Sequence, residues 1–160
     1  MTVFRCCYFI VIMLPLSWIA SFPLTVAAAE GLVINEIQYN PSEDYPFEYE
    51  FVELYNSTRS PIDVSGFAFT EGIAYRIPDG TTLPARSYML VVRDPSHSVW
   101  KNRRGIILGP FLGELEDRGA LLRLRSPDGT VADEVEYNDR SPWPRNADGY
   151  GSSLERISAE

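Results

Sequence analysis

The chain of 160 residues carries 22 acidic and 14 basic side chains, which gives it a formal net charge of −8. Its hydrophobic fraction of 45% is typical of one globular domain with a buried core and excludes a disordered chain. Because an acidic surface repels phosphate groups, we expect no generic binding to nucleic acids and no adsorption to anionic lipids by charge alone.

Residues 1–29 have the pattern of an export signal. Arg5 comes before a long apolar stretch, and Ala27 and Ala29 stand where a signal peptidase requires small residues, which predicts cleavage before Glu30. An uncleaved membrane anchor stays open as the alternative, since the apolar run is nearly long enough to span a bilayer. The pattern predicts an exported protein that is secreted, periplasmic or held at the cell surface.

The exported chain, residues 30–160, is predicted to form a single domain without cysteine. The two cysteines of the sequence, Cys6 and Cys7, both lie within the signal segment. Disulfides, thiol catalysis and zinc–thiolate sites are therefore excluded from the exported product. We also expect no stable membrane span after the signal is cleaved.

Twelve prolines and eleven glycines are spread along the chain, which favours short strands and many turns over long helices. Only "PSHSVWKNRR", residues 95–104, has the features of one or two helical turns. Strands at this spacing, without long helices between them, predict an all-β sandwich or barrel. The predicted strands, in chain order, are residues 32–39, 50–56, 66–70, 74–77, 87–93, 120–125 and 130–137, followed by a last strand at "SLERI".

Residues 120–125 and 130–137 form the clearest hairpin of the sequence. They are joined by "SPDG", in which Asp128 and Gly129 are typical turn residues. Alternation places Asp133 on the same face of its strand as two valines and a tyrosine. The side chains predicted to pair across the solvated face are Arg123, Arg125, Glu134 and Glu136.

Six segments follow one another in a characteristic order. They are "LVINEIQYNP", "EFVELYNSTRSPIDVSGFAFTE", "YRIPDGTTLPARSYMLVV", "GALLRLRSPDGTVADEVEYND", "PWP" and "DGYGSSLERI". Together they resemble the lamin tail domain family, and most closely its bacterial exported members. The resemblance implies an immunoglobulin-like β-sandwich of roughly a hundred residues or more, without a catalytic site. It also implies a module that binds or tethers, because bacterial relatives occur on secreted and surface proteins, often beside enzyme domains.

The chain departs from the family pattern in two ways. DNA binding by animal lamin tails depends on a basic surface, whereas this chain is acidic, so we do not expect that activity here. Bacterial relatives often continue beyond the "SLERI" strand, whereas this sequence stops at Glu160. A stand-alone module and a piece of a longer gene product are both consistent with that ending.

The stretch "EFVELYN" raises the question of a working carboxylate. As a strand, it places Val52 and Leu54 on one face and Glu53 between two aromatic residues on the other. Glu36 has a similar setting on the preceding strand, so the two acids are a candidate catalytic pair. We favour a structural role for Glu53 on the outer face, held where necessary by a partner such as an arginine from a neighbouring strand.

Two loops contain groups of residues that superficially suggest a site. Residues so close in sequence as those of "DPSHS" cannot align a nucleophile, a base and an orienting acid, and His97 is the only histidine, which excludes a histidine-rich metal site. "NADGYG" faintly resembles a calcium loop but lacks regularly spaced acids, and a glycine turn is the favoured interpretation. The residues concerned are Asp94, Ser96, His97 and Ser98 in the first loop and Asn146, Asp148 and Gly149 in the second.

Asn56 and Trp143 each have two interpretations. Asn56 begins "NST", which fits a glycosylation acceptor and equally a turn. Trp143 stands between two prolines, where we favour a plug that covers one end of the sandwich over a platform that stacks on sugars.

The sequence therefore predicts a non-enzymatic, exported binding or tethering module, with no catalytic residue, no cofactor and no metal site. A protein or a cell-surface component is the expected partner. Two alternatives stay open: a carbohydrate- or calcium-dependent surface-recognition domain, and an accessory module cut from a larger secreted hydrolase. The predicted core comprises Val52 and Leu54 with Val33 or Ile34, Ile37, Leu90, Val92, Leu122, Leu124, Val135 and Leu154.

Overall fold

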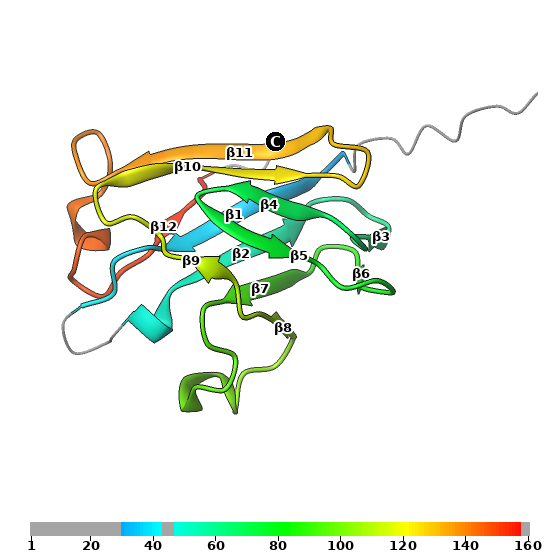
Figure 1. The fold of residues 1–160 in the computed structure, drawn as a ribbon, viewed down its shortest axis with the longest axis horizontal. Helices are drawn as coiled ribbons and strands as arrows, with labels where there is room; N and C mark the ends of the chain where they lie inside the picture. The colour runs from blue at the N-terminus through cyan, green and yellow to red at the C-terminus, as the bar shows by residue number, and fades with distance from the viewer. Residues whose placement is uncertain (1–29, 43–46, 158–160) are drawn as a thin grey trace, which may run out of the picture.

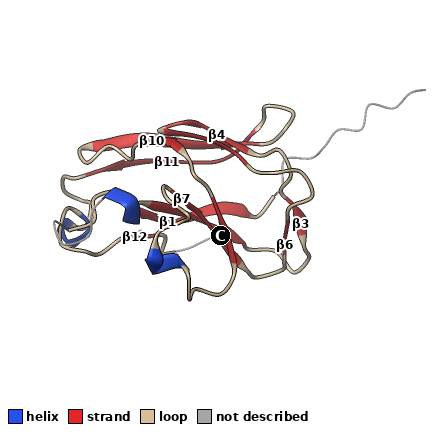
Figure 2. Ribbon diagram, turned by 60° about the horizontal axis from the view of Figure 1, so that its bottom comes forward, coloured by secondary structure: helices blue, strands red, loops and turns tan. Residues whose placement is uncertain are grey.

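The computed structural model describes residues 30–42 and 47–157. The predicted export signal, residues 1–29, lies outside the described residues. Within the described ranges the chain forms twelve strands and three short 3-10 helices, η1 (Phe47–Tyr49), η2 (Ser98–Trp100) and η3 (Arg145–Ala147). The strands build two layers that face each other, with a short ribbon across one end (Figures 1 and 2). The prediction of an immunoglobulin-like β-sandwich is confirmed.

The first layer is a five-stranded sheet with the order β12-β1-β2-β7-β8. Its strands pair antiparallel except β7 with β8, which run parallel. Their bounds are β1 (Leu32–Gln38), β2 (Phe51–Asn56), β7 (Tyr88–Val92), β8 (Ile106–Leu108) and β12 (Leu154–Glu155). The short strand β12 is thus one edge of this layer.

The second layer has the order β11-β10-β4-β5-β9, and all its strands pair antiparallel. Its strands are β4 (Ala68–Glu71), β5 (Ile73–Arg76), β9 (Leu112–Gly113), β10 (Gly119–Arg125) and β11 (Val131–Asn138). The separate ribbon pairs β3 (Ile62–Asp63) with β6 (Thr82–Leu83). The sequence did not predict strands β3, β6, β8 and β9, because runs of two or three residues show no periodicity.

The main core lies between the layers and follows the predicted alternation. Val52 and Leu54 are fully buried and lie opposite Val91 and Met89 of β7. This confirms the chosen face of β2. The predicted core residues Ile34, Ile37, Leu122, Leu124 and Leu154 are also buried here, while Val135 is only partly buried.

Leu90 and Val92 are buried but belong to a different cluster. Because side chains alternate along β7, these two point to the outer face, where they pack with Trp100. Helix η2 carries Trp100 and covers this face, so β7 is buried on both sides. Their predicted burial is confirmed, but they pack in this second cluster and not with Leu54, because a continuous apolar run does not show which cluster each residue joins. The helical turn predicted within 95–104 is η2.

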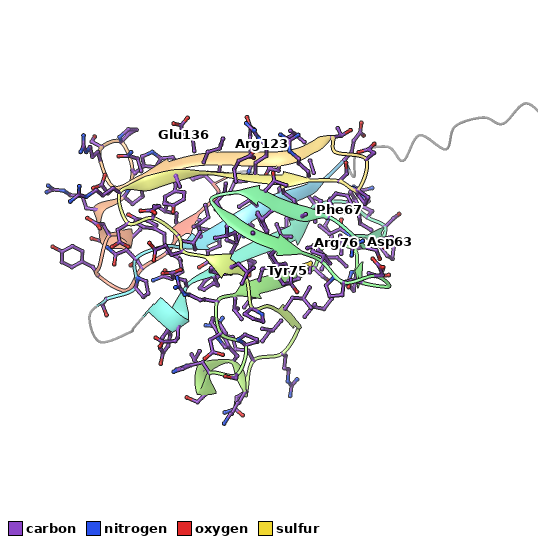
Figure 3. The ribbon with its side chains drawn as sticks, in the orientation of Figure 1. Asp63, Phe67, Tyr75, Arg76, Arg123 and Glu136 are labelled. Carbon is purple, nitrogen blue, oxygen red and sulfur yellow. The ribbon has the colours of Figure 1, made fainter. Side chains whose placement is uncertain are left out.

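The clearest predicted hairpin forms, but only one of its two predicted arginine–glutamate pairs forms. Arg123 lies opposite Glu134 and its Nε donates to the carboxylate at 2.6 Å. A bulge places Arg125 opposite Val131 instead, and Arg125 reaches Glu71 at 3.8 Å. Glu136 lies opposite Leu121, so the second predicted cross-pair does not form. Figure 3 shows Arg123 and Glu136 on the outer side of this layer.

Candidate binding groove between the edges of the two sheets

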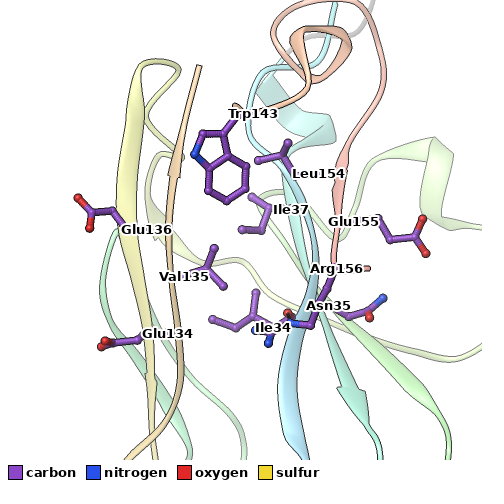
Figure 4. Close-up of a pocket in the computed structure, with 10 residues that line it drawn as sticks. All are labelled: Ile34, Asn35, Ile37, Glu134, Val135, Glu136, Trp143, Leu154, Glu155 and Arg156. Carbon is purple, nitrogen blue, oxygen red and sulfur yellow. Dashed lines mark hydrogen bonds between the residues drawn. The ribbon is translucent and has the colours of Figure 1, made fainter. Parts of the chain in front are cut away.

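A groove of about 340 Å³ opens where the edge of one layer meets the edge of the other. Strand β11 forms one wall, and β1 with β12 forms the other (Figure 4). Its apolar surface is lined by Ile34, Ile37, Val135, Trp143 and Leu154. Its polar rim is lined by Asn35, Glu134, Glu136, Glu155 and Arg156.

A bulge in β1 shapes the first wall. Ile34 pairs with Leu54 and Glu36 pairs with Glu53, so Asn35 is the extra residue. The bulge keeps Ile34 and the later Ile37 both on the inner face. Asn35 is thereby directed to the outer surface, as Figure 4 shows.

Asp133 and Arg156 link the two walls. The Asp133 carboxylate accepts hydrogen bonds from the Ile34 backbone N–H at 2.7 Å and from Arg156 Nη2 at 2.5 Å. Arg156 also donates through Nε to the Ile34 carbonyl at 2.9 Å, and its own backbone N–H donates to the Asn35 carbonyl at 2.8 Å. These bonds satisfy the edge of β1 that β12 leaves unpaired. Sequence reasoning placed Asp133 on the inward face but found no role for it.

Trp143 covers the groove at its other end. Its backbone N–H donates to the Arg140 carbonyl at 2.9 Å, which holds the turn that carries the ring. The half-buried indole packs against the main core and lies across the groove from Ile37 and Leu154 (Figure 4). The ring therefore packs against the core, as the plug interpretation expected, and it also forms part of the groove wall.

Strand β11 has one unpaired edge. It hydrogen-bonds to β10 along its length, and no other strand in the described part of the chain pairs with it. Val135 points into the groove, whereas Glu134 and Glu136 point to the outer surface (Figure 4). An antiparallel strand in this position presents half of its backbone donors and acceptors to the groove side.

The comparison with known families agrees with this architecture. The sequence profile of the Lamin Tail Domain family matches residues 25–139, which is more than half of the chain. The chain belongs to the lamin tail domain family. Among proteins with curated descriptions, none matches it.

Glu36 and Glu53 of this lamin tail domain lie directly opposite each other on adjacent strands, as the candidate pair required. They lie on the outer face and neither lines the groove. Asn35 Nδ2 donates to Glu53 at 2.9 Å, and the Ser153 hydroxyl donates to Glu36. Burial raises the pKa of Glu53, the hydrogen bond from Asn35 lowers it, and the charge of Glu36 raises it. The hydrogen-bond partner of Glu53 is thus the amide of Asn35, where a partner such as an arginine was expected.

The "DPSHS" loop forms local turns. The Asp94 carboxylate accepts hydrogen bonds from the Ser96 backbone N–H at 2.9 Å and from the Ser96 hydroxyl at 2.6 Å, and these bonds lower the pKa of Asp94. His97 caps η2, where its Nδ1 accepts from the Val99 N–H at 3.4 Å, and its ring lies 4.7 Å from that of Tyr49. The structure does not align these residues as a triad.

The "NADGYG" loop is tied to the end of β1. Asp148 accepts a hydrogen bond from Asn40 Nδ2 at 2.9 Å, and the Gly149 N–H donates to the Asn40 carbonyl at 3.0 Å. Burial first, and then the charges of Asp148 and two further aspartates, raise the pKa of nearby Tyr39 to about 12. Across residues 30–42 and 47–157, no three acidic, histidine or cysteine side chains are grouped so as to hold a metal ion.

Asn56 serves the turn. Its side chain is fully buried, and Nδ2 donates to the carbonyls of Ser60, Leu83 and Pro84 at 2.9–3.0 Å. Its Oδ1 accepts from the Thr58 N–H at 2.9 Å. A glycan attached at Nδ2 would remove one of its two N–H donors and would have to fit at a fully buried side chain, so the turn interpretation of "NST" is favoured over the glycosylation acceptor.

Glu50 is a buried acid that sequence reasoning missed. It accepts hydrogen bonds from Arg93 Nη1 at 3.1 Å and from the Leu115 N–H at 3.2 Å. Burial raises its pKa, while both hydrogen bonds lower it. It anchors the segment after β9, and no local pattern at the start of a strand could reveal that contact.

None of the helices in the described ranges is long and apolar enough to cross a bilayer.

Proposed function

We propose that this lamin tail domain is an exported, non-enzymatic module that binds a protein or cell-surface partner through the groove between β11 and β12. The observation that carries the proposal is the groove itself. Its apolar side chains lie beside an unpaired strand edge, which is the combination that proteins use to bind extended segments. The export pattern in residues 1–29 supports an extracytoplasmic partner.

The position of the acidic side chains supports a binding role over hydrolysis. Catalytic carboxylates of glycosidases flank a bond held in a cleft. Glu36 and Glu53 lie on the outer face of the first layer, each held by a neighbouring polar side chain. Half of the residues that line the groove are aliphatic or carry the indole, and Glu134 and Glu136 point away from it to the outer surface. The groove therefore offers contact area, without an acid–base pair aimed into it.

The proposal is tested by binding of the purified protein to the envelope fraction of the cells that export it, measured by biolayer interferometry. We expect saturable binding that Trp143→Ala greatly weakens, because the indole forms part of the groove wall. Tyr150→Ala is the matched control, since Tyr150 is 77% exposed and lies outside the groove lining. Thermal melts establish that both variants are folded. An absence of saturable binding, or equal losses in both variants, contradicts the proposal.

A further inference from the structure

Strand β11 offers the longest unpaired edge beside the groove. Seven of its eight residues pair with β10, and its other edge makes no backbone hydrogen bond within the described ranges. An extended peptide can add a strand to such an edge, with main-chain hydrogen bonds supplying affinity. Alternate side chains of the added strand then point to opposite faces of the sheet.

Strand β10, the paired neighbour of β11, indicates which side chains fit on each face beside β11. Leu122 and Leu124 of β10 point inward and are fully buried, while Arg123 points outward and pairs with Glu134 at 2.6 Å. A strand on the free edge meets the same two faces of β11. Its inward side chains would lie over Val135 and the groove, and its outward ones would lie beside the glutamates.

The charge on the outer face of β11 favours cations at the outward positions. Glu136 is exposed and forms no ion pair with any described residue, and Glu134 is shared with β10 alone. A second copy of β11 on this edge would place glutamates against glutamates, and like charges directly opposite one another destabilise a strand pair. The two carboxylates therefore disfavour self-pairing and at the same time select a cationic partner.

We propose that the free edge of β11 binds an extended peptide of alternating apolar and cationic residues, which extends the second layer by one strand. This inference rests on the proposed binding function and specifies the chemistry of the partner. The apolar side chains contact Val135 and Trp143, and the cationic side chains pair with Glu134 and Glu136. The peptide thus repeats, on the open edge, the pattern that β10 presents on the paired one.

The test uses the acetylated and amidated peptide TLRLRLT as the probe, with binding measured by fluorescence anisotropy at low and at physiological salt. We expect binding that weakens with salt, and no binding of TLELELT or of the non-alternating TLLLRRT. Methylation of the backbone nitrogens that face β11 should weaken binding by about tenfold or more, because it removes main-chain hydrogen bonds. Binding that tolerates this methylation overturns the proposal.

Protein variants locate the site. Glu136→Lys should weaken the probe by about three- to tenfold, since it replaces an attraction with a repulsion. Glu114→Lys makes the same change in charge next to β9, at the opposite edge of the same layer, and should have little effect. In amide hydrogen exchange, the probe should slow exchange in β11. Equal losses in the two variants, or protection elsewhere, overturn the proposal.

The outcome separates this inference from the proposed function. If the probe fails to bind while Trp143→Ala still abolishes binding to the envelope fraction, strand addition by a cationic peptide is wrong and the groove remains a binding site. If the probe binds as expected but the envelope fraction does not, the chemistry of the edge is supported and the proposed cellular role is wrong.

Discussion

Asp133 joins the two layers of the sandwich through Arg156, whose Nη2 lies 2.5 Å from the Asp133 carboxylate. The two side chains are 17% and 28% exposed, so the pair is largely shielded from solvent. Because Asp133 also accepts the Ile34 N–H, one carboxylate neutralises a cation and satisfies a strand edge. This link connects the strands that form the two walls of the groove.

Removal of that carboxylate should destabilise the protein. Asp133→Ala leaves Arg156 without its counter-ion and the Ile34 N–H without an acceptor, which should lower the free energy of unfolding by about 2–4 kcal/mol. Urea denaturation measures the change. Asp79→Ala is the matched control, because its ion pair with Arg76 is on the surface and should contribute under about 1 kcal/mol. Similar changes in both variants would show that the link is not structural.

The assignment of the core face of β2 is tested by two leucines. Leu54 is fully buried, so Leu54→Ala should lower the free energy of unfolding by about 2–5 kcal/mol. Leu112 is 71% exposed, and Leu112→Ala should change it by less than about 0.5 kcal/mol. Denaturant melts at equal protein concentration provide the comparison. A small loss for Leu54→Ala would mean that β2 presents its other face to the core.

Replacement of Glu53 by glutamine should not destabilise the protein at neutral pH. The pKa of Glu53 is raised above 4.5, chiefly by burial, so the folded state binds this proton more tightly than the unfolded state. Its ionisation therefore costs stability as the pH rises through the interval just above 4.5. Glutamine removes that cost, and its carbonyl still accepts from Asn35.

Urea melts of wild type and Glu53→Gln at pH 4 and pH 7 test whether ionisation of Glu53 lowers the stability of the fold. We expect similar stabilities at pH 4 and, at pH 7, a variant as stable as wild type or more so by under about 1 kcal/mol. A clear loss of stability at pH 7 contradicts the account. The same proteins should show no turnover on glycan, ester and phosphoester panels, whereas turnover that Glu53→Gln abolishes would identify an enzyme.

Calcium should leave the melting temperature unchanged. Asp148 already accepts a hydrogen bond from Asn40, and within the described residues no third ligand completes a metal site. An ion that binds only the folded state raises the melting temperature. Differential scanning calorimetry with calcium and with chelator measures this directly. A calcium-dependent rise that Asp148→Asn removes would support the alternative of a calcium-dependent recognition domain.

Strand spacing in the sequence predicted an all-β sandwich or barrel, and the resemblance to the lamin tail domain family implied the sandwich. Alternation predicted much of the core because it is a local property. The alternation of "EFVELYN" was enough to bury Val52 and Leu54. It could not show the bulge at Asn35, since a bulge is defined by the strand opposite. It also could not divide β7 into inner and outer clusters, because the cover from Trp100 comes from a later segment.

The groove depends on contacts between distant segments, and this is why the sequence did not reveal it. Asp133 and Arg156 are 23 residues apart, and Asp133 is 99 residues from Ile34. An aspartate among inward-facing apolar residues was the one local sign of that link. Trp143 was interpreted as a plug at one end of the sandwich, and the structure places it, partly buried, in the lining of the groove with residues of β1, β11 and β12.

Amide hydrogen exchange of the protein, with and without the partner from the envelope fraction, tests the central claim most directly. The account predicts that the partner slows exchange in β11 and in the turn that carries Trp143, while the outer face around Glu53 and Tyr88 is unaffected. Protection confined to that outer face, with none in β11, would contradict the assignment of the groove as the binding site.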